Sequence, residues 1–369
     1  MHFRNALRVA RGLRVSGSKA MAKGASWLRP LTLRSLSAPV RAQEDVMRNF
    51  LKQVPLPMAG LTLGLASLGN LYKLAGWQLV GDLTGIVAGL LFGLVLLKLC
   101  LTPLHAAGSL QDPIIASVSP TFSMTLMILC TYFVAWGMPL PVATIVWLMA
   151  VAIHFGLMIF FVLRHLIPQP KAWQMIYPSW FVTFVGLGVI PVTSSQFVPA
   201  LGQPLFWMAL VIYVALFPFV LHRLRHVPLP EATQPLLTIM AAPDSLCLTG
   251  YLASFDHPNF WLATGMLIFA QSLYFITLVS IRQYTRLSFY PSFAAFTFPL
   301  VISATALTKY IAAFAQNGTV HDLMSVLQWG EWIAATLMLV FVTGHYLHFL
   351  RRIRKGIKAA AQDAQKVIE

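Results

Sequence analysis

The sequence predicts an all-α polytopic membrane protein with ten transmembrane helices paired as five helical hairpins. Of its 369 residues, 58% are hydrophobic and only 10% are charged, and the mean hydropathy is +0.73. Soluble domains carry about 25% charged residues. In addition, ten apolar windows follow one another along the chain. Each is close to the ~20 residues that a helix needs to cross a bilayer.

The ten windows are separated by polar or Pro/Gly breaks. Several connections, such as "WGMPLP" and "SFDHPN", are short enough to pair neighbouring helices as hairpins. The predicted spans are 55–78, 81–103, 114–136, 139–165, 173–197, 199–222, 232–254, 258–281, 289–314 and 322–350. We therefore expect a basic N-terminal tail over 1–54, a transmembrane domain over 55–350 and a basic C-terminal tail over 351–369.

Positive charge is concentrated in the two tails, which together carry +13 of the net +15. Because these residues flank a membrane region, anionic lipid headgroups are the expected partner and a nucleic acid is not. The N-terminal tail has no acidic residue before Glu44. It resembles a mitochondrial transit peptide in this respect, and a cytoplasmic tail of a bacterial protein accounts for it equally well.

Basic residues in the loops predict the orientation. Six of them follow the fourth, sixth and eighth spans: Arg164, Lys171, Arg223, Arg225, Arg282 and Arg286. They lie on the same side as both tails, and basic loops stay in the cytoplasm. The sequence thus predicts a multi-pass protein of the inner (plasma) membrane with both termini cytoplasmic.

Odd and even spans differ in texture. The third, fifth, seventh and ninth spans are rich in Ser and Thr, and their prolines include Pro120, Pro191, Pro243 and Pro299. An interior proline removes a helical hydrogen bond, which a membrane tolerates only where neighbours or water satisfy the freed group. We therefore expect these prolines to kink or line helices around a central pathway, with smooth even spans facing lipid. The alternative is that small and hydroxyl residues simply allow close helix packing.

Three motifs on odd spans carry a family resemblance. They are "GLTLGLASLGNLY" (60–72), "PLLTIMAAPDSLCLTGYL" (235–252) and "AFTFP" (295–299) followed by "TKY" (308–310). By their order and spacing, residues 50–350 resemble the tellurite-resistance/dicarboxylate transporter family. This family includes the bacterial tellurite-resistance channel, yeast-type malate permeases and the slow anion channel of plant guard cells.

The resemblance implies a fold and a gate. The fold has five hairpins in a pseudo-fivefold arrangement around a central pore, usually as a homotrimer. A phenylalanine of the ninth helix plugs the pore, and by motif it is Phe298. The residues themselves agree with this role, because Pro299 removes a helical hydrogen bond next to Phe298. The resulting kink could direct the Phe298 ring across a lumen. Hydrophobic constrictions gate ion pathways by dewetting.

Further residues are candidates by position. Gly64 allows close helix approach, and Thr297, Ser303 and Thr305 could offer hydroxyls to an anion. Lys309 is expected at the external mouth, either attracting anions or snorkelling to the headgroups. Asp244 is ionisable inside a span, which suggests function. It could be protonated, pair with Lys98 or an arginine of a neighbouring helix, or lie in the cytoplasmic vestibule.

The predicted function is a passive channel for inorganic anions or small dicarboxylates. The alternative is a proton-coupled C4-dicarboxylate (malate-type) or sulfite transporter, with Asp244 as its proton site. An enzyme is not expected, because the spans hold no cluster of acidic residues and the His345/His348 pair lies close to the cytoplasmic end, beside "RRIRK". The lack of a Walker A motif excludes ATP-driven transport by this chain alone. Neither a cofactor nor a metal is expected, because the three cysteines have no metal-ligand spacing. The residues that could argue for one are His345 and His348, which share a helix face.

Overall fold

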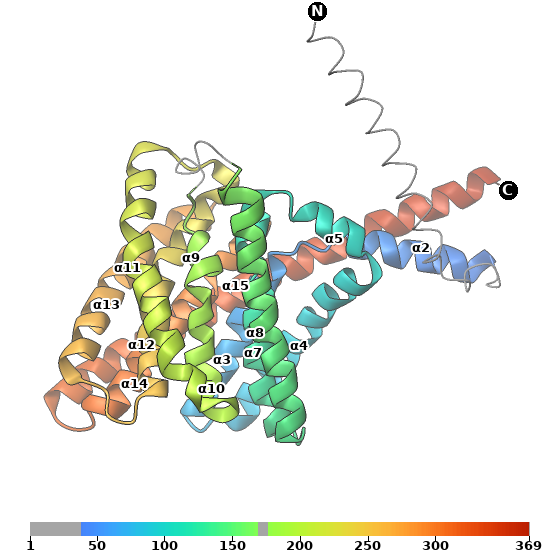
Figure 1. Ribbon diagram of the computed structural model, residues 1–369. Coiled ribbons are helices and arrows are strands. Elements are labelled where there is room, and N and C mark those ends of the chain that lie inside the picture. Colours follow the sequence, from blue (N-terminus) through green and yellow to red (C-terminus); the bar gives the residue numbers. More distant parts are fainter. Residues whose placement is uncertain (1–37, 169–175, 369) are drawn as a thin grey trace, which may run out of the picture. The chain divides into compact units, whose positions relative to one another are not determined.

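The computed structural model describes residues 38–168 and 176–368, in which every regular element is a helix (Figure 1). Residues 1–37, and Lys171 used above for orientation, lie outside the described residues. The elements, in chain order, are α2 (Ala38–Gln53), α3 (Met58–Leu74), α4 (Gln78–Leu101), α5 (Pro103–Ser109), α6 (Pro113–Val118), α7 (Thr121–Ala135), α8 (Leu140–Phe161), the π-helical η2 (Val162–Leu166), α9 (Trp180–Phe184), η4 (Gly186–Gly188), α10 (Val189–Phe197), η5 (Pro199–Leu201), α11 (Gly202–His226), η6 (Glu231–Ala241), α12 (Ala242–Ser254), α13 (Phe260–Tyr284), η7 (Pro291–Phe296), α14 (Phe298–Phe314) and α15 (Thr319–Ile368).

The chain divides into two compact units. The larger, Phe50–Ile357, contains α3 to α14 and most of α15. The smaller comprises Met1–Asn49 and Lys358–Glu369, of which the structure describes the start of α2 and the last turns of α15. The C-terminal tail predicted over 351–369 is therefore helical as far as it is described.

Eight helices in the described ranges are long and apolar enough to cross a bilayer. They correspond to the predicted spans two to four and six to ten. The first predicted span is α3, which has 17 residues and would count only together with the helix before it. The fifth is divided into α9, η4 and α10, and its residues 173–175 are not described. The structure thus supports an all-helical multi-span protein, while ten spans in five hairpins remain a prediction.

Burial alternates along the chain as the texture of the spans predicts. In the third, seventh and ninth predicted spans, 72–83% of the most apolar stretch is buried inside the protein. In the even spans the share is 22–33%. A helix that is apolar all round and buried on one side only needs lipid on its other side. The hydroxyl-rich helices are therefore inside and the smooth helices outside.

The inner helices are broken partway along. The break falls between α6 and α7, between η6 and α12, and at Thr297 between η7 and α14. Pro120, Pro243 and Pro299 each lie at or just after such a break, at the start of the following α-helix. In a first turn the missing N–H of proline leaves no hydrogen bond unmade. These three prolines therefore restart helices rather than kink continuous ones.

Candidate ion conduit

Three contiguous cavities run between the inner helices. We call the end of the helices that carries Arg164, Arg223 and Arg282 the basic end. The proximal cavity lies at this end and is lined by Lys52, Lys98, His105, Asp112 and Tyr290 among others. The central cavity follows, and the distal cavity beyond it reaches Lys73 and Lys309. Their volumes are about 340, 60 and 360 Å³, so the central cavity is the smallest of the three.

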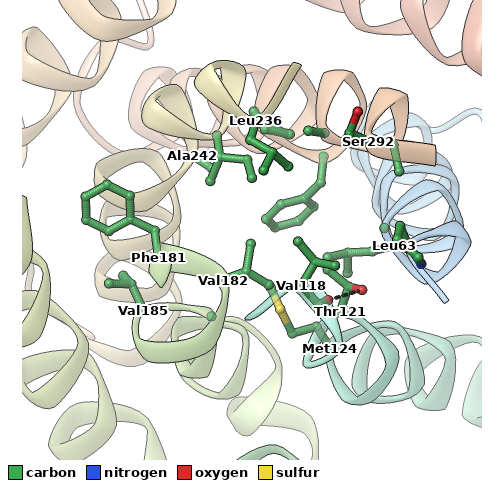
Figure 2. Close-up of a pocket in the computed structure, with 18 of the residues that line it drawn as sticks. Leu63, Val118, Thr121, Met124, Phe181, Val182, Val185, Leu236, Ala242 and Ser292 are labelled. Carbon is green, nitrogen blue, oxygen red and sulfur yellow. Dashed lines mark hydrogen bonds between the residues drawn. The ribbon is translucent and has the colours of Figure 1, made fainter. Parts of the chain in front are cut away.

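The central cavity is lined from all the inner spans and carries no charge. Figure 2 shows side chains from different helices, among them Leu63, Met124, Val182 and Leu236, around one space. The hydroxyls on its wall belong to Thr121 and Ser292. The Thr121 hydroxyl already donates to the Val118 carbonyl at 2.7 Å. An anion in this space therefore finds few groups to replace its water.

Shared lining residues connect the cavities. Pro57, Val118, Leu236, Pro291 and Ser292 line both the proximal and the central cavity. Two residues, Phe298 and Leu246, line both the central and the distal cavity. These two side chains therefore form the boundary between the distal half of the passage and the rest.

Phe298 is the first residue of α14, and its position is set by its neighbours. The Thr297 hydroxyl donates to the carbonyls of Ala294 at 2.7 Å and Gly60 at 3.1 Å, which fixes the break to α3. A Cβ atom at Gly64 would lie 2.6 Å from the Thr297 Cβ and 3.1 Å from the Phe298 backbone nitrogen. Only glycine fits there without displacing the segment. Gly64 and Thr297 thus position the ring, and neither lines the three cavities described here.

A comparison with known protein families identifies the family to which this chain belongs. The family model of the voltage-dependent anion channel SLAC1 matches residues 53–352, from the start of the proximal cavity through most of α15. The chain belongs to the voltage-dependent anion channel family. An uncharacterized transporter of Methanocaldococcus jannaschii is 24% identical over 249 residues, which is 58% of this chain and 69% of the relative. The family resemblance predicted from the three motifs is confirmed.

The remaining candidate residues fall into two groups, those that line one of the three cavities and those that line none. Pro243 and Pro299 line the central cavity, and Thr305 and Lys309 line the distal one. The others line none of the three: Pro120, Pro191, Thr297, Ser303, Gly64 and Asp244. The Ser303 hydroxyl instead lies 3.0 Å from that of Ser245, between α14 and α12.

Asp244 lies in the first turn of α12 and is only 4% exposed. One carboxylate oxygen, Oδ2, has no hydrogen-bond partner among the described residues. Its surroundings include Tyr213 of α11 and the backbone of Ala270 in α13. It therefore faces the outer helices and not a vestibule of the conduit.

The suggested pairing of Asp244 with Lys98 does not occur. The Lys98 ammonium donates to the carbonyls of Lys52 at 3.0 Å and Val54 at 2.5 Å. These carbonyls lie where α2 ends and the chain turns into α3. The last carbonyls of a helix have no intrahelical partner, so they can accept hydrogen bonds from the ammonium. Lys98 thus fastens α4 to this turn.

Leu246 borders two of the cavities and is a residue that sequence reasoning missed. It lies in the quoted seventh-span motif, but a leucine in an apolar helix carries no signal of its own. Its place depends on η4, because a Cβ at Gly188 would lie 3.0 Å from the Leu246 Cγ. The histidines of α15 show no metal arrangement: His345 Nδ1 lies 2.9 Å from the Phe341 carbonyl. No group of three His, Cys, Asp or Glu in the described ranges could hold a metal ion.

Proposed function

We propose that the protein is a passive channel for small anions, closed between the central and distal cavities by Phe298 with Leu246. The observation that carries this proposal is that these two side chains line both cavities. An apolar constriction of this kind excludes water and therefore ions, until the ring moves. The proposal is supported by membership of the anion channel family.

The uncharged central cavity implies a selectivity. An anion must leave most of its hydration shell to enter a space of about 60 Å³ with two hydroxyl-bearing side chains on its wall. Removing water from an unpaired charge costs free energy, and this cost rises with charge density. We therefore expect weakly hydrated monovalent anions such as nitrate to pass more readily than sulfite or malate.

A proton-coupled C4-dicarboxylate or sulfite transporter is the alternative, and the unpartnered oxygen of Asp244 is what favours it. Coupling requires that protonation alter the binding or movement of the permeant. Asp244 lines none of the three cavities, and the central cavity is lined by no titratable side chain. These positions support the passive mechanism over the coupled one.

The architecture proposed with this function is ten spans in five hairpins around the conduit, in an inner (plasma) membrane and as a homotrimer. An even number of spans would place both termini on one side of the membrane, and the basic loops indicate that this side is the cytoplasm. The lipid bilayer and the permeant anions are then the partners, with no cofactor.

The test is the current through purified wild-type and Phe298→Ala protein in a planar bilayer. Chloride, nitrate, sulfite and malate are compared at fixed voltage and at two pH values. Phe275→Ala on α13 is the matched control, because its ring is 46% exposed on the outer surface and removing it should change neither assembly nor current. A wild-type current equal to or above that of Phe298→Ala would contradict the gate. Acid-driven malate uptake without current would favour the carrier.

A further inference from the structure

The distal cavity contains two lysines in different electrostatic states. The Lys73 ammonium lies 2.6 Å from Asp82 Oδ1 and 4.0 Å from the centroid of the Tyr132 ring. Lys309 is half-buried, and the described residues give its ammonium neither an ion pair nor a hydrogen bond. Unlike the Ser67 hydroxyl, the Lys309 nitrogen is not among the buried polar atoms that lack a partner, so it is open to the cavity that the side chain lines. An anion that enters this cavity can therefore reach the ammonium.

Lys309 shares a face of α14 with the constriction. Phe298, Ile302, Thr305 and Lys309 follow one another at helical spacing, and all four line the distal cavity. The backbone rise from Phe298 to Lys309 is about 16 Å. Because Cα–Cβ bonds tilt towards the N-terminus of a helix, the Lys309 side chain leaves the backbone in the direction of Phe298.

Helix α3 contributes neutral donors to the same cavity. The Ser67 hydroxyl is buried, lines the cavity and has no hydrogen-bond partner among the described residues. It lies about one turn beyond Gly64, beside the constriction. Asn70 donates to Thr131 Oγ1 at 3.1 Å and, having a second amide hydrogen, can donate once more. An ammonium, a hydroxyl and an amide thus line one cavity.

We propose that the distal cavity is a binding site for one singly charged inorganic anion, held by Lys309 and Ser67 on the distal side of Phe298. The charge of Lys73 is balanced by Asp82, and no other charged residue is among those that line the cavity. The site therefore offers one net positive charge. A sulfate or dicarboxylate would bring a second negative charge without a partner. The inference rests on the proposed conduit, through which the anion reaches the cavity.

The experiment measures binding at equilibrium, without current. Full-length protein carrying Cys100→Ala and Thr305→Cys is treated in detergent with a negatively charged methanethiosulfonate reagent, and nitrate is added to protect the new thiol. Cys100 is exposed and must be removed, whereas Cys130 and Cys247 are buried. We expect nitrate to slow modification, and sulfate at equal ionic strength to slow it less.

Lys309→Gln should raise the nitrate concentration for half-protection on the order of tenfold, since a charge-assisted contact is lost. Lys309→Arg should keep it within about twofold, because the charge remains. Ser67→Ala should raise it by a smaller factor, about threefold, for one neutral hydrogen bond. Lys355→Gln is the control, because this exposed lysine lines none of the three cavities.

Equal protection by sulfate and nitrate would overturn the single charge of the ligand. Protection that Lys309→Gln leaves unchanged, in protein that elutes as wild type in size exclusion, would overturn the site. Anion current without protection by nitrate would contradict the binding site but not the proposed channel. Protection that depends on Lys309, with no current from Phe298→Ala, would contradict the channel but not the binding site.

Discussion

The central and distal cavities lie on either side of Phe298 and differ in chemistry. The central cavity has about a sixth of the distal volume and no charged lining residue, whereas the distal cavity is lined by two lysines and an asparagine. In the proposed channel, the barrier to an anion is therefore in the centre and the attraction is beside it. The comparison teaches that one helix, α14, supplies both, with Phe298 at its start and Lys309 three turns later.

The largest effect should come from removing the barrier. Phe298→Ala should raise anion current by roughly 10- to 100-fold, because burying a side chain of this size is worth about 1.5–3 kcal/mol and each 1.36 kcal/mol is a factor of ten in rate. Single-channel recording would separate a larger conductance from a longer open time. A rise limited to sulfite and malate would show that the central cavity selects differently from our expectation.

A second variant displaces the gate without changing it. Gly64→Ala places a methyl group 2.6 Å from Thr297, and overpacking of this kind costs about 1–3 kcal/mol. We expect a lower midpoint of thermal unfolding and an altered current, measured on the same preparation. Gly89→Ala on α4 is the matched control, since nothing lies within 4 Å of the added methyl. Equal stability of the two variants would mean that α3 does not position the ring.

Leu246, which lines the same two cavities as Phe298, should contribute less than the ring itself. Leu246→Ala is expected to raise the current about three- to tenfold, because the smaller side chain closes less of the constriction. The double variant with Phe298→Ala would measure their coupling, which should be non-additive for residues that block one passage. Additive effects would place the two side chains at separate barriers.

Lys73 should matter less than Lys309, although both line the distal cavity. Its charge is already balanced by Asp82, so Lys73→Gln should change the half-protecting nitrate concentration by less than about threefold. The thiol-protection assay above measures this directly. An effect as large as that of Lys309→Gln would show that the ion pair with Asp82 opens when an anion binds.

The smallest effect is expected at Asp244. For a passive channel, Asp244→Asn should leave the current within about twofold of wild type at both pH values, since the carboxyl lines none of the three cavities. Liposome uptake of malate under an acid-inside or acid-outside gradient checks the alternative. Loss of pH-driven uptake in this variant would establish the proton-coupled carrier.

Sequence reasoning reached the inner and outer helices because hydropathy, hydroxyl content and proline are properties of consecutive residues. Through the family motif it also singled out Phe298, whose side chain borders the central and distal cavities. It did not reach Leu246, which differs from other leucines only by lying between Gly188 and the conduit. It left the surroundings of Asp244 open, because a residue's depth along a span does not tell which side of the helix it faces.

By itself, the sequence determined that this is an all-helical membrane protein of an anion channel family, and which helices are inside it. Tertiary structure alone decided which side chains meet across the conduit and which charges find partners. Lys98 and Lys309 illustrate the difference, since both are lysines in apolar helices. Lys98 donates to carbonyls at the end of α2, whereas Lys309 lines the distal cavity. The physical reason is that burial is favoured residue by residue along a chain, whereas electrostatic pairing depends on distances between groups that the fold alone brings together.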